Sequence, residues 1–354
     1  MITYSKSAGY NDAAIGKLET PIKMIIEHES DLLTKKGGIC DMLFNVERSQ
    51  RFGETIIGGN EFDIFQATAE GDAAAKDSIV ETYSKFIEHI QFTKEFSISA
   101  EMMEDANYGV AADAKRRAEN FTRAYYKTMN KICEKALIEA TAQNTNYAGA
   151  TIDLTTADGC PLFSASHRWG SDAATSGSQS NYFSGEFFGI GETDRAFSTD
   201  ILEEALYALS GKLRGMLDEN GNPLGYTADT IIIPGNQPKE ESMIKKVCGS
   251  VSAPGTSFND INLNYGNWNI VVLPSWQTTD FRMMIMSSEA NKNLCGNMFF
   301  NRVPLTVTNW VDNHTGSFIW NGRCRFGVGF GSYKHILLAV DSTSEVDGSE
   351  FLNL

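Results

Sequence analysis

The feature that most constrains this fold is a long run of apolar side chains repeated at helical spacing. Between positions 110 and 140 an apolar residue recurs every three or four residues, which places the whole set on one face of a single α-helix. Such a helix spans about 45 Å, so the rest of the chain must be organised along it. We therefore predict a helix from Val110 to Ala142. The apolar face contains Val110, Ala114, Ala118, Phe121, Tyr125, Met129, Ile132, Ala136 and Ala140.

The opposite face of this predicted helix is basic, although the whole chain is acidic. The sequence has 30 Lys and Arg against 45 Asp and Glu, and a net charge of -15 disfavours free nucleic acid as a direct ligand. Two interpretations stay open: a solvated face with ion pairs between neighbouring turns, or a surface that faces nucleic acid or an acidic protein. The basic residues are Lys115, Arg116, Arg117, Arg123, Lys127, Lys131 and Lys135, and the acidic ones are Asp113, Glu119, Glu134 and Glu139.

The segment before the helix predicts an extended two-stranded loop over residues 54–98. A strand-like run covers Thr55–Phe65, and the small residues around Glu70–Asp72 separate it from a returning run. In the returning run, apolar and polar side chains alternate with the period of two that is typical of a half-buried strand. The buried face is expected to hold Phe86, Ile90, Phe92, Phe96 and Ile98, and the exposed face His89, Gln91, Thr93, Glu95, Ser97 and Ser99.

Residues 1–53 have weak periodicity, which predicts an extended arm rather than a domain. Only Met24–Leu33 is expected to be helical. The Gly37–Gly38 pair should end that helix, because glycine loses the most backbone freedom on ordering. Ser99 is expected to cap a further short helix, with Glu101 in its first turn, before the long helix begins.

The second half of the chain alternates helices with short apolar strands, which predicts an α+β fold. Residues 159–191 are rich in Ser, Gly, Ala and Asn and indicate a long loop. Ser198 or Thr199 should then cap a helix whose apolar side extends to Leu217. The further predicted elements are a turn at Asp218–Pro223, strands at Thr230–Ile233, Trp268–Leu273 and Phe281–Met286, a helix at Lys239–Val247, and alternating strands after Met298.

Two short patterns resemble known ligand-binding loops but lack essential residues. Gly327–Gly331 approaches a dinucleotide fingerprint, yet its last glycine is misplaced and the segment is predicted to be a strand. Asp218, Asn220 and Asn222 resemble the start of a calcium loop, but Pro223 replaces the required glycine and Asp229 stands at the position of the bidentate glutamate. We therefore predict no cofactor site and a plain turn in place of a calcium site.

The histidines and cysteines do not predict a catalytic or metal site either. The five histidines lack the spacing of a zinc motif, and no two of the six cysteines form a CxxC pair. A Cys160–His167 couple that acts as a hydrolase stays open as a minor alternative. Reduced thiols, no signal peptide and no apolar run of about 18 residues predict a chain of a reducing cytoplasm without a membrane span.

Three short segments, in this order, resemble the major head protein of tailed bacteriophages with the Hong Kong 97 fold. Phe96–Ala106 (FSISAEMMEDA) resembles the junction between an extended loop and a spine helix. Pro161–His167 (PLFSASH) resembles an element of the Mu-type major head subunit group, and Phe326–Phe330 (FGVGF) resembles its C-terminal strand. The resemblance covers nearly the whole chain.

The resemblance implies a shell-building subunit with five parts and no catalytic role. These parts would be an N-terminal arm (1–53), an extended β-loop (54–98), a spine helix with the first part of a peripheral domain (99–198), an axial domain (199–289) and the returning strands of the peripheral domain (290–354). The implied partners are further copies in pentamers and hexamers, a scaffolding protein, a portal, a decoration protein and packaged double-stranded DNA, met through the basic helix face. Assembly is expected in the bacterial cytoplasm, and the product in the virion.

The resemblance also leaves alternatives open. An encapsulin-like compartment is a second shell of the same fold. Some relatives begin with a scaffolding segment that a protease removes, and this chain is expected to rely on a separate scaffold or to lack that segment. Some relatives cross-link a loop lysine to a neighbouring asparagine; Lys76, Lys85 and Lys94 are available, but ordinary exposed lysines are favoured.

Overall fold

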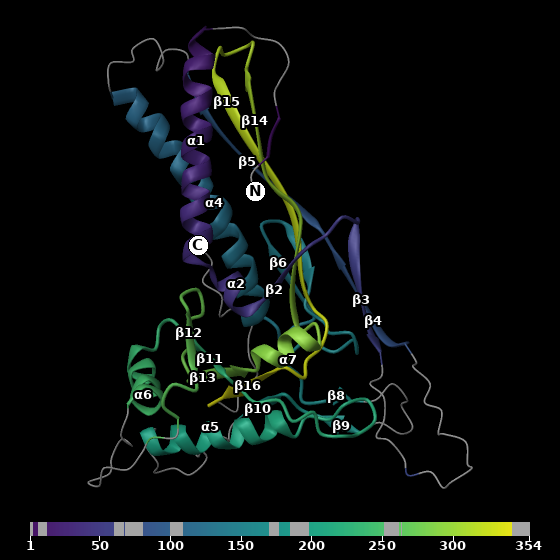
Figure 1. The fold of residues 1–354 in the computed structure, drawn as a ribbon. Coiled ribbons are helices and arrows are strands. Elements are labelled where there is room, and N and C mark those ends of the chain that lie inside the picture. The colour runs from purple at the N-terminus through teal and green to yellow at the C-terminus, as the bar shows by residue number, and fades with distance from the viewer. Residues whose placement is uncertain are drawn as a thin grey trace. The chain divides into compact units, whose positions relative to one another are not determined.

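The computed structural model describes residues 3–5, 13–59, 67, 81–99, 109–169, 177–184, 198–250, 262 and 264–341 (Figure 1). The chain divides into two compact units. Unit 1 comprises Met1–Glu54, Glu88–Cys133 and Phe299–Val328, and unit 2 comprises Thr55–Ile87, Glu134–Met298 and Gly329–Leu354. Both units mix helices and strands, as predicted. Most of the predicted loop tip and the short helix after Ser99 lie outside the described residues.

Unit 1 contains a five-stranded sheet and the long helices. The strand order is β1–β14–β15–β5, and β2 also pairs with β14. The longest helix, α4, continues from unit 1 into unit 2, as do β14 and β15. The elements are β1 (Thr3–Ser5), α1 (Ala13–Lys36), α2 (Ile39–Leu43), β2 (Asn45–Arg48), β5 (Ile90–Ile98), α4 (Gly109–Ile138), β14 (Asn297–Val311) and β15 (Phe318–Phe330).

The apolar face of α4 is buried in unit 1, as its spacing predicted. Ala114, Ala118 and Phe121 form a core with residues of α1 and of the sheet. Beneath Phe121 lies Gly322 of β15, where a Cβ atom would come within 2.2 Å of the aromatic ring. The helix ends at Ile138 rather than Ala142, because the chain turns there and the carbonyl of Ala140 accepts a hydrogen bond from the amide of Phe163.

The N-terminal arm is more helical than its sequence indicated, so the prediction of one short helix at Met24–Leu33 was wrong. Helix α1 has 24 residues and lies beside α4 (Figure 1). Ile22 and Ile26 of α1 are buried in the same core as the α4 stripe. Tertiary packing stabilises a helix whose own periodicity is weak. The predicted break is confirmed: α1 ends at Lys36, and Gly37 adopts a positive φ of 69°.

The alternation predicted for the returning strand reverses at His89. Two strands replace the single run, namely β4 (Glu81–Glu88) and β5. In β5 the expected face is turned inward, but in β4 Lys85 and Ile87 are buried while Phe86 is 51% exposed. His89 is also buried, and its Nε2 lies 2.8 Å from Ser49 Oγ. Burial, with the charge of Arg325, lowers the pKa of His89. Because His89 is buried and hydrogen-bonded, the inward-facing side chains change from odd positions in β4 to even positions in β5. Sequence alternation alone would have kept one set of positions inward along the whole run.

Unit 2 is built on a second five-stranded sheet, in the order β10–β16–β13–β11–β12. Helices α5 (Thr199–Arg214) and α6 (Pro238–Gly249) share one core with this sheet. Ser198 caps α5, since its hydroxyl accepts the amide of Ile201 at 3.4 Å, but α5 ends before Leu217 and Met216 is buried instead. The strands are β10 (Tyr182–Ser184), β11 (Thr230–Pro234), β12 (Asn269–Leu273), β13 (Arg282–Met286) and β16 (Ile336–Val340), and α7 covers Ser288–Asn293.

Three smaller two-stranded sheets complete the described part of unit 2. The pair β3 (Gly53–Gly59) and β4 forms the base of the predicted extended loop. The predicted loop at 159–191 contains short strands, β8 (His167–Arg168) and β9 (Ser178–Gln179), in addition to β10. A hairpin of β6 (Asn144–Tyr147) and β7 (Ala150–Asp153) was not predicted.

The β6–β7 hairpin offers a test of backbone strain. Ala148 and Gly149 connect the strands with φ values of 50° and 84°, the left-handed pair that a two-residue hairpin turn requires. Replacing Ala148→Asn should raise the free energy of unfolding by about 0.5–1 kcal/mol, because Asn tolerates positive φ better than Ala. Ala148→Val should lower it, since a branched Cβ is strained there. Denaturant unfolding measures both; equal effects of the two variants would contradict the turn assignment.

His335 predicts an acid-sensitive core in unit 2. Its ring is fully buried, Nε2 lies 2.9 Å from Asn297 Oδ1, and burial lowers the pKa to about 3, opposed by the backbone of Ser332. The neutral ring is therefore favoured in the folded state. This preference contributes stability that is fully present above the unfolded pKa of about 6.5 and is lost as pH falls towards 3, by an amount on the order of 5 kcal/mol.

The measurement is the free energy of unfolding of wild type and of His335→Gln between pH 7 and pH 4. The variant should be less stable at pH 7 but should depend less on pH, because glutamine does not titrate. His314→Gln, at an exposed histidine, is the matched control and should keep the wild-type slope. An unchanged slope in His335→Gln would contradict the assignment.

Candidate functional site

The structure gathers three potential metal-ligating side chains in unit 2 within one short segment. Asp158, Cys160 and His167 each offer one ligand atom, and these atoms lie within 4.8 Å of one another. The sequence suggested the Cys160–His167 couple but gave no indication of Asp158. The available signal was the compact spacing of the three residues within ten positions, which none of the familiar zinc patterns describes.

Hydrogen bonds fix the histidine of this group on both sides. Nδ1 of His167 lies 2.7 Å from Asp158 Oδ2, and Nε2 lies 3.1 Å from the carbonyl oxygen of Leu162. The ring is completely buried and stacks on Tyr333, with centroids 3.8 Å apart and an angle of 6° between the planes. Position and orientation of the imidazole are thus determined by three different contacts.

The aspartate is held equally firmly by its second oxygen. Asp158 Oδ1 accepts hydrogen bonds from Thr156 Oγ1 at 2.5 Å and from the amide of Cys160 at 3.1 Å. Burial alone would raise the pKa of Asp158, but the hydrogen bonds and charge supplied chiefly by His167 lower it below its ordinary value. The carboxylate is therefore ionised and aimed at the histidine.

Asn181 joins the same segment to the rest of unit 2. Its side-chain amide donates to the carbonyl oxygen of Leu162 at 2.6 Å, and its Oδ1 accepts the amide of Ser164 at 3.0 Å. Tyr333, which stacks on His167, in turn receives a hydrogen bond from Gln179 at 2.6 Å. Leu162 and His167 of the PLFSASH segment are thus tied into a buried polar network with Asn181, while Ala165 and Ser166 of the same segment are exposed.

The geometry gives no support to a Cys160–His167 hydrolase. A catalytic base needs a ring nitrogen free to accept the thiol proton, but both nitrogens of His167 face other acceptors. Burial and the neighbouring Asp158 raise the pKa of the Cys160 thiol, whereas an activated nucleophile needs a lowered one. Cys160 is consequently a protonated thiol in this arrangement.

The other sequence candidates take structural positions. Asp218 Oδ1 accepts the amides of Asn220 and Asn222 at 2.8 and 2.7 Å, so it stabilises the turn that was predicted in place of a calcium loop. Asp229 is engaged elsewhere, with the amide of Ser288. The glycines of 327–331 lie in or just after β15; a Cβ atom at Gly329 would lie 2.6 Å from the side chain of Ile87.

The candidate cross-linking lysines differ from one another. Lys85 is not an ordinary exposed lysine: its side chain is 7% exposed and forms an ion pair with Asp153. It also donates to Thr155 Oγ1 at 2.6 Å. Lys94 is exposed, and Lys76 lies outside the described residues. A reaction of Lys85 with another chain would first have to break this ion pair, in which Lys85 is buried and Asp153 is exposed.

The basic face of α4 is largely neutralised by ion pairs. Arg116 and Arg117 both contact Asp113 at 2.7 Å, and their hydrogen bonds lower the pKa of that carboxyl group. Arg123 lies 2.6 Å from Glu29 of α1. Lys135 pairs with Glu139 at 3.5 Å, and Lys115 with Glu119 at 3.9 Å.

Two lysines of this face differ from the others. Within the part of the chain that the structure describes, Lys127 and Lys131 form no ion pair, and Lys127 is exposed. Glu134, by contrast, is buried rather than part of the solvated face. The interpretation as a paired, solvated face therefore holds for most of α4, and Lys127 with Lys131 forms the part with available positive charge.

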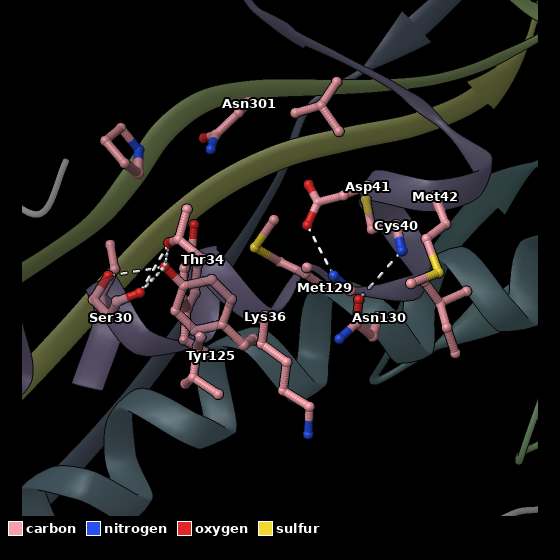
Figure 2. A pocket seen from close by; sticks show the side chains of 18 residues that line it. Ser30, Thr34, Lys36, Cys40, Asp41, Met42, Tyr125, Met129, Asn130 and Asn301 are labelled. Atoms are coloured by element: carbon pink, nitrogen blue, oxygen red, sulfur yellow. Dashed lines mark hydrogen bonds between the residues drawn. The ribbon is translucent and has the colours of Figure 1, made fainter. Parts of the chain in front are cut away.

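Unit 1 also has a cavity of about 450 Å³ beside the α1–α2 turn, shown in Figure 2. Tyr126 of α4 bonds Ser30 and Thr34 of α1 at 2.8 Å, and Asn130 accepts the amide of Cys40 at 3.3 Å. Polar side chains away from these bonds, Lys36 and Asn301, also line the cavity. It is lined by Ser30, Leu33, Thr34, Lys36, Gly37, Gly38, Ile39, Cys40, Asp41, Met42, Val46, Tyr125, Tyr126, Met129, Asn130, Asn301, Pro304 and Leu305.

Comparison with solved structures identifies the fold. The capsid of the cyanophage P-SCSP1u is similar to this chain with a TM-score of 0.50 and 9% identity, over 87% of this chain and 89% of that one. The capsid of Ralstonia phage GP4 gives a TM-score of 0.50 and 9% identity, over 86% and 88% of the two chains. At this identity the similarity shows a shared fold alone.

Comparison of sequences gives the family. No curated protein matches the sequence. Among the described residues, no helix is both long and apolar enough to cross a membrane. The model of a family described as phage capsid protein matches residues 82–339, which is well over half of the chain. This chain therefore belongs to the phage capsid protein family.

Proposed function

We propose that this chain is the major subunit of a tailed-phage head, which assembles into a closed icosahedral or prolate shell around the double-stranded DNA genome. The observation that carries the proposal is the family match over residues 82–339. The capsid fold shared with the cyanophage and Ralstonia phage proteins supports it. Within this proposal, the fold is of the Hong Kong 97 type and the nearest group is the Mu-type major head subunit.

Five functional parts follow from the same proposal. Residues 1–53 form the arm, 54–98 the extended loop, 99–198 the spine helix with the first part of the peripheral domain, 199–289 the axial domain and 290–354 the returning strands. The long helix α4 and the β3–β4 pair support the spine and the loop. The sheet covered by α5 and α6 supports a separate axial part.

Assembly would rest on many modest contacts between copies rather than on one site. Head-to-tail contacts that close by rotation give rings, here pentamers and hexamers, and each subunit engages several neighbours at once. Large apolar side chains that are exposed in the single chain are the candidate contact residues. They include Met24, Leu32, Met42, Val46, Phe52, Ile57, Phe86, Tyr207, Tyr265 and Trp310.

The remaining partners are also proposals. A scaffolding protein, a portal and a decoration protein would accompany the shell, and assembly would take place in the host cytoplasm. Packaged DNA would be met non-specifically by Lys127 and Lys131, the two lysines on the basic face of α4 that form no ion pair among the described residues. The role is structural and involves no catalysis.

An encapsulin-like compartment is the second candidate, since it is also a closed protein shell. The family match favours a phage capsid. Neighbouring terminase and portal genes would support the phage assignment, whereas a neighbouring peroxidase or ferritin-like gene would support the compartment.

The extended loop gives the sharpest test of assembly. Electron microscopy of the purified or scaffold-coexpressed chain should show rings or closed shells. Deletion of Gly58–Val80 should leave the subunit folded, because the cores of both units lie outside that segment, but should block closure. Circular dichroism and sedimentation measure the two properties. Closed shells from the deletion would refute the role of the loop, and a wild-type chain that stays monomeric in all conditions would refute the shell.

The orientation of α4 can be tested in filled heads. Formaldehyde should join packaged DNA to Lys127 and Lys131, because it bridges a lysine amine to an amino group of a nearby base with loss of water, and these two lysines of α4 form no ion pair among the described residues. Peptide mapping by mass spectrometry identifies the attached lysines, and empty heads provide the background. In Lys127→Gln/Lys131→Gln heads these attachments should disappear. Attachment only at lysines of other elements would contradict the inward orientation.

A further inference from the structure

We propose that Asp158, Cys160 and His167 bind a zinc ion that fastens the PLFSASH segment in unit 2. The proposal concerns stability of the subunit and does not depend on its role in a shell. Its basis is the convergence of a thiol, an imidazole and a carboxylate within 4.8 Å of one another.

The donor set selects the metal. Sulfur and nitrogen ligands are typical of zinc, whereas calcium and magnesium take oxygen ligands almost exclusively. Zinc sites commonly have four ligands, with Zn–S near 2.3 Å and Zn–N near 2.0 Å, so neighbouring ligand atoms are about 3.5 Å apart. His167 Nδ1 and Asp158 Oδ2, now 2.7 Å apart, would separate by about 0.6 Å. The Cys160 sulfur, which lies within 4.8 Å of both atoms, would approach them by about 1 Å. Cys160 can supply that movement, because its sulfur makes only a long contact of 4.0 Å with the carbonyl of Ser166.

The surroundings already hold the other two ligands in the manner of a metal site. A zinc-binding histidine usually donates its second ring N–H to a carbonyl or carboxylate. His167 Nε2 makes such a bond to the carbonyl of Leu162 at 3.1 Å, which leaves Nδ1 directed at the candidate site. Asp158 Oδ1 is held by Thr156 and by the amide of Cys160, which leaves Oδ2 directed there.

The three candidate ligands differ in burial, which affects both the shielding of the ion and its entry. The side chains of His167 and Asp158 are 0% and 4% exposed, so the ion would be shielded from competing water. Cys160 is half-buried, which gives the ion an entry path and leaves the fourth position to a water molecule. The zinc would replace both the proton that now lies between His167 and Asp158 and the proton of the Cys160 thiol, which would be released to solvent, and it would connect Cys160 to that pair.

Cys160 and Cys295 form a matched pair for the first experiment. Both are half-buried cysteines of unit 2 that form no disulfide, and the other four cysteines are buried. The purified full-length chain is treated with iodoacetamide with and without one equivalent of Zn²⁺, and alkylation of each cysteine is quantified by mass spectrometry. Zinc should slow alkylation of Cys160 at least tenfold and leave Cys295 unchanged. Equal protection of both thiols, or of neither, would overturn the proposal.

A second measurement uses variants. Cys160→Ser removes the soft ligand at a half-buried position, and its fold is checked by circular dichroism. Zinc titration of the wild-type chain should show one bound ion and a raised Tm, and Cys160→Ser should lose at least tenfold in zinc affinity. Cys295→Ser should behave as wild type. If Cys160→Ser retains zinc as well as the wild-type chain does, the zinc is bound adventitiously at other groups and the proposed site is wrong. This outcome does not depend on whether the chain forms shells.

Discussion

The ring of Phe121 lies against the backbone of Gly322, and the arrangement of unit 1 depends on this close approach. A side chain at position 322 would come within 2.2 Å of the ring, so only glycine lets α4 approach β15 this closely. Phe96 of β5 lies 5.2 Å from Phe121 and 6.2 Å from Trp320, and these rings fill the space between helix and sheet. Helix α1 then packs its buried isoleucines into the same core.

Strong periodicity made several elements predictable from the sequence. The α4 stripe, the capped helix after Ser198 and the apolar strand at Thr230–Pro234 all appear where the pattern indicated, with differences of a few residues at their ends. Each of these elements buries a face that its own residues define, so local sequence is sufficient. The missed helix in the arm is different, because Ile22 and Ile26 become a core only through α4.

The candidate site was harder to predict for the same reason. The spacing of Asp158, Cys160 and His167 was visible, but their convergence depends on the turn at 156–160 and on Tyr333 and Asn181, which are distant in sequence. Lys85 was misjudged as exposed because its partner Asp153 lies on another strand. The sequence indicated which residue types could act as ligands. It could not predict their burial or their hydrogen-bond partners, because these depend on contacts with residues that are distant in the chain. A capsid protein functions through extended contact surfaces, so its sequence has no compact motif from which a site could be predicted instead.

The reversal of parity at His89 constrains how this part of the chain can change in evolution. Between Lys85 and His89 the odd positions are buried, with Ile87 against Gly329, while Phe86 is directed outward. A single inserted residue in that stretch would exchange the two faces and place Phe86 where Ile87 now packs, whereas two inserted residues would preserve them. Length variation among natural relatives should therefore avoid this stretch or occur there in pairs, and the freedom to alter the loop should be confined to segments without a buried face.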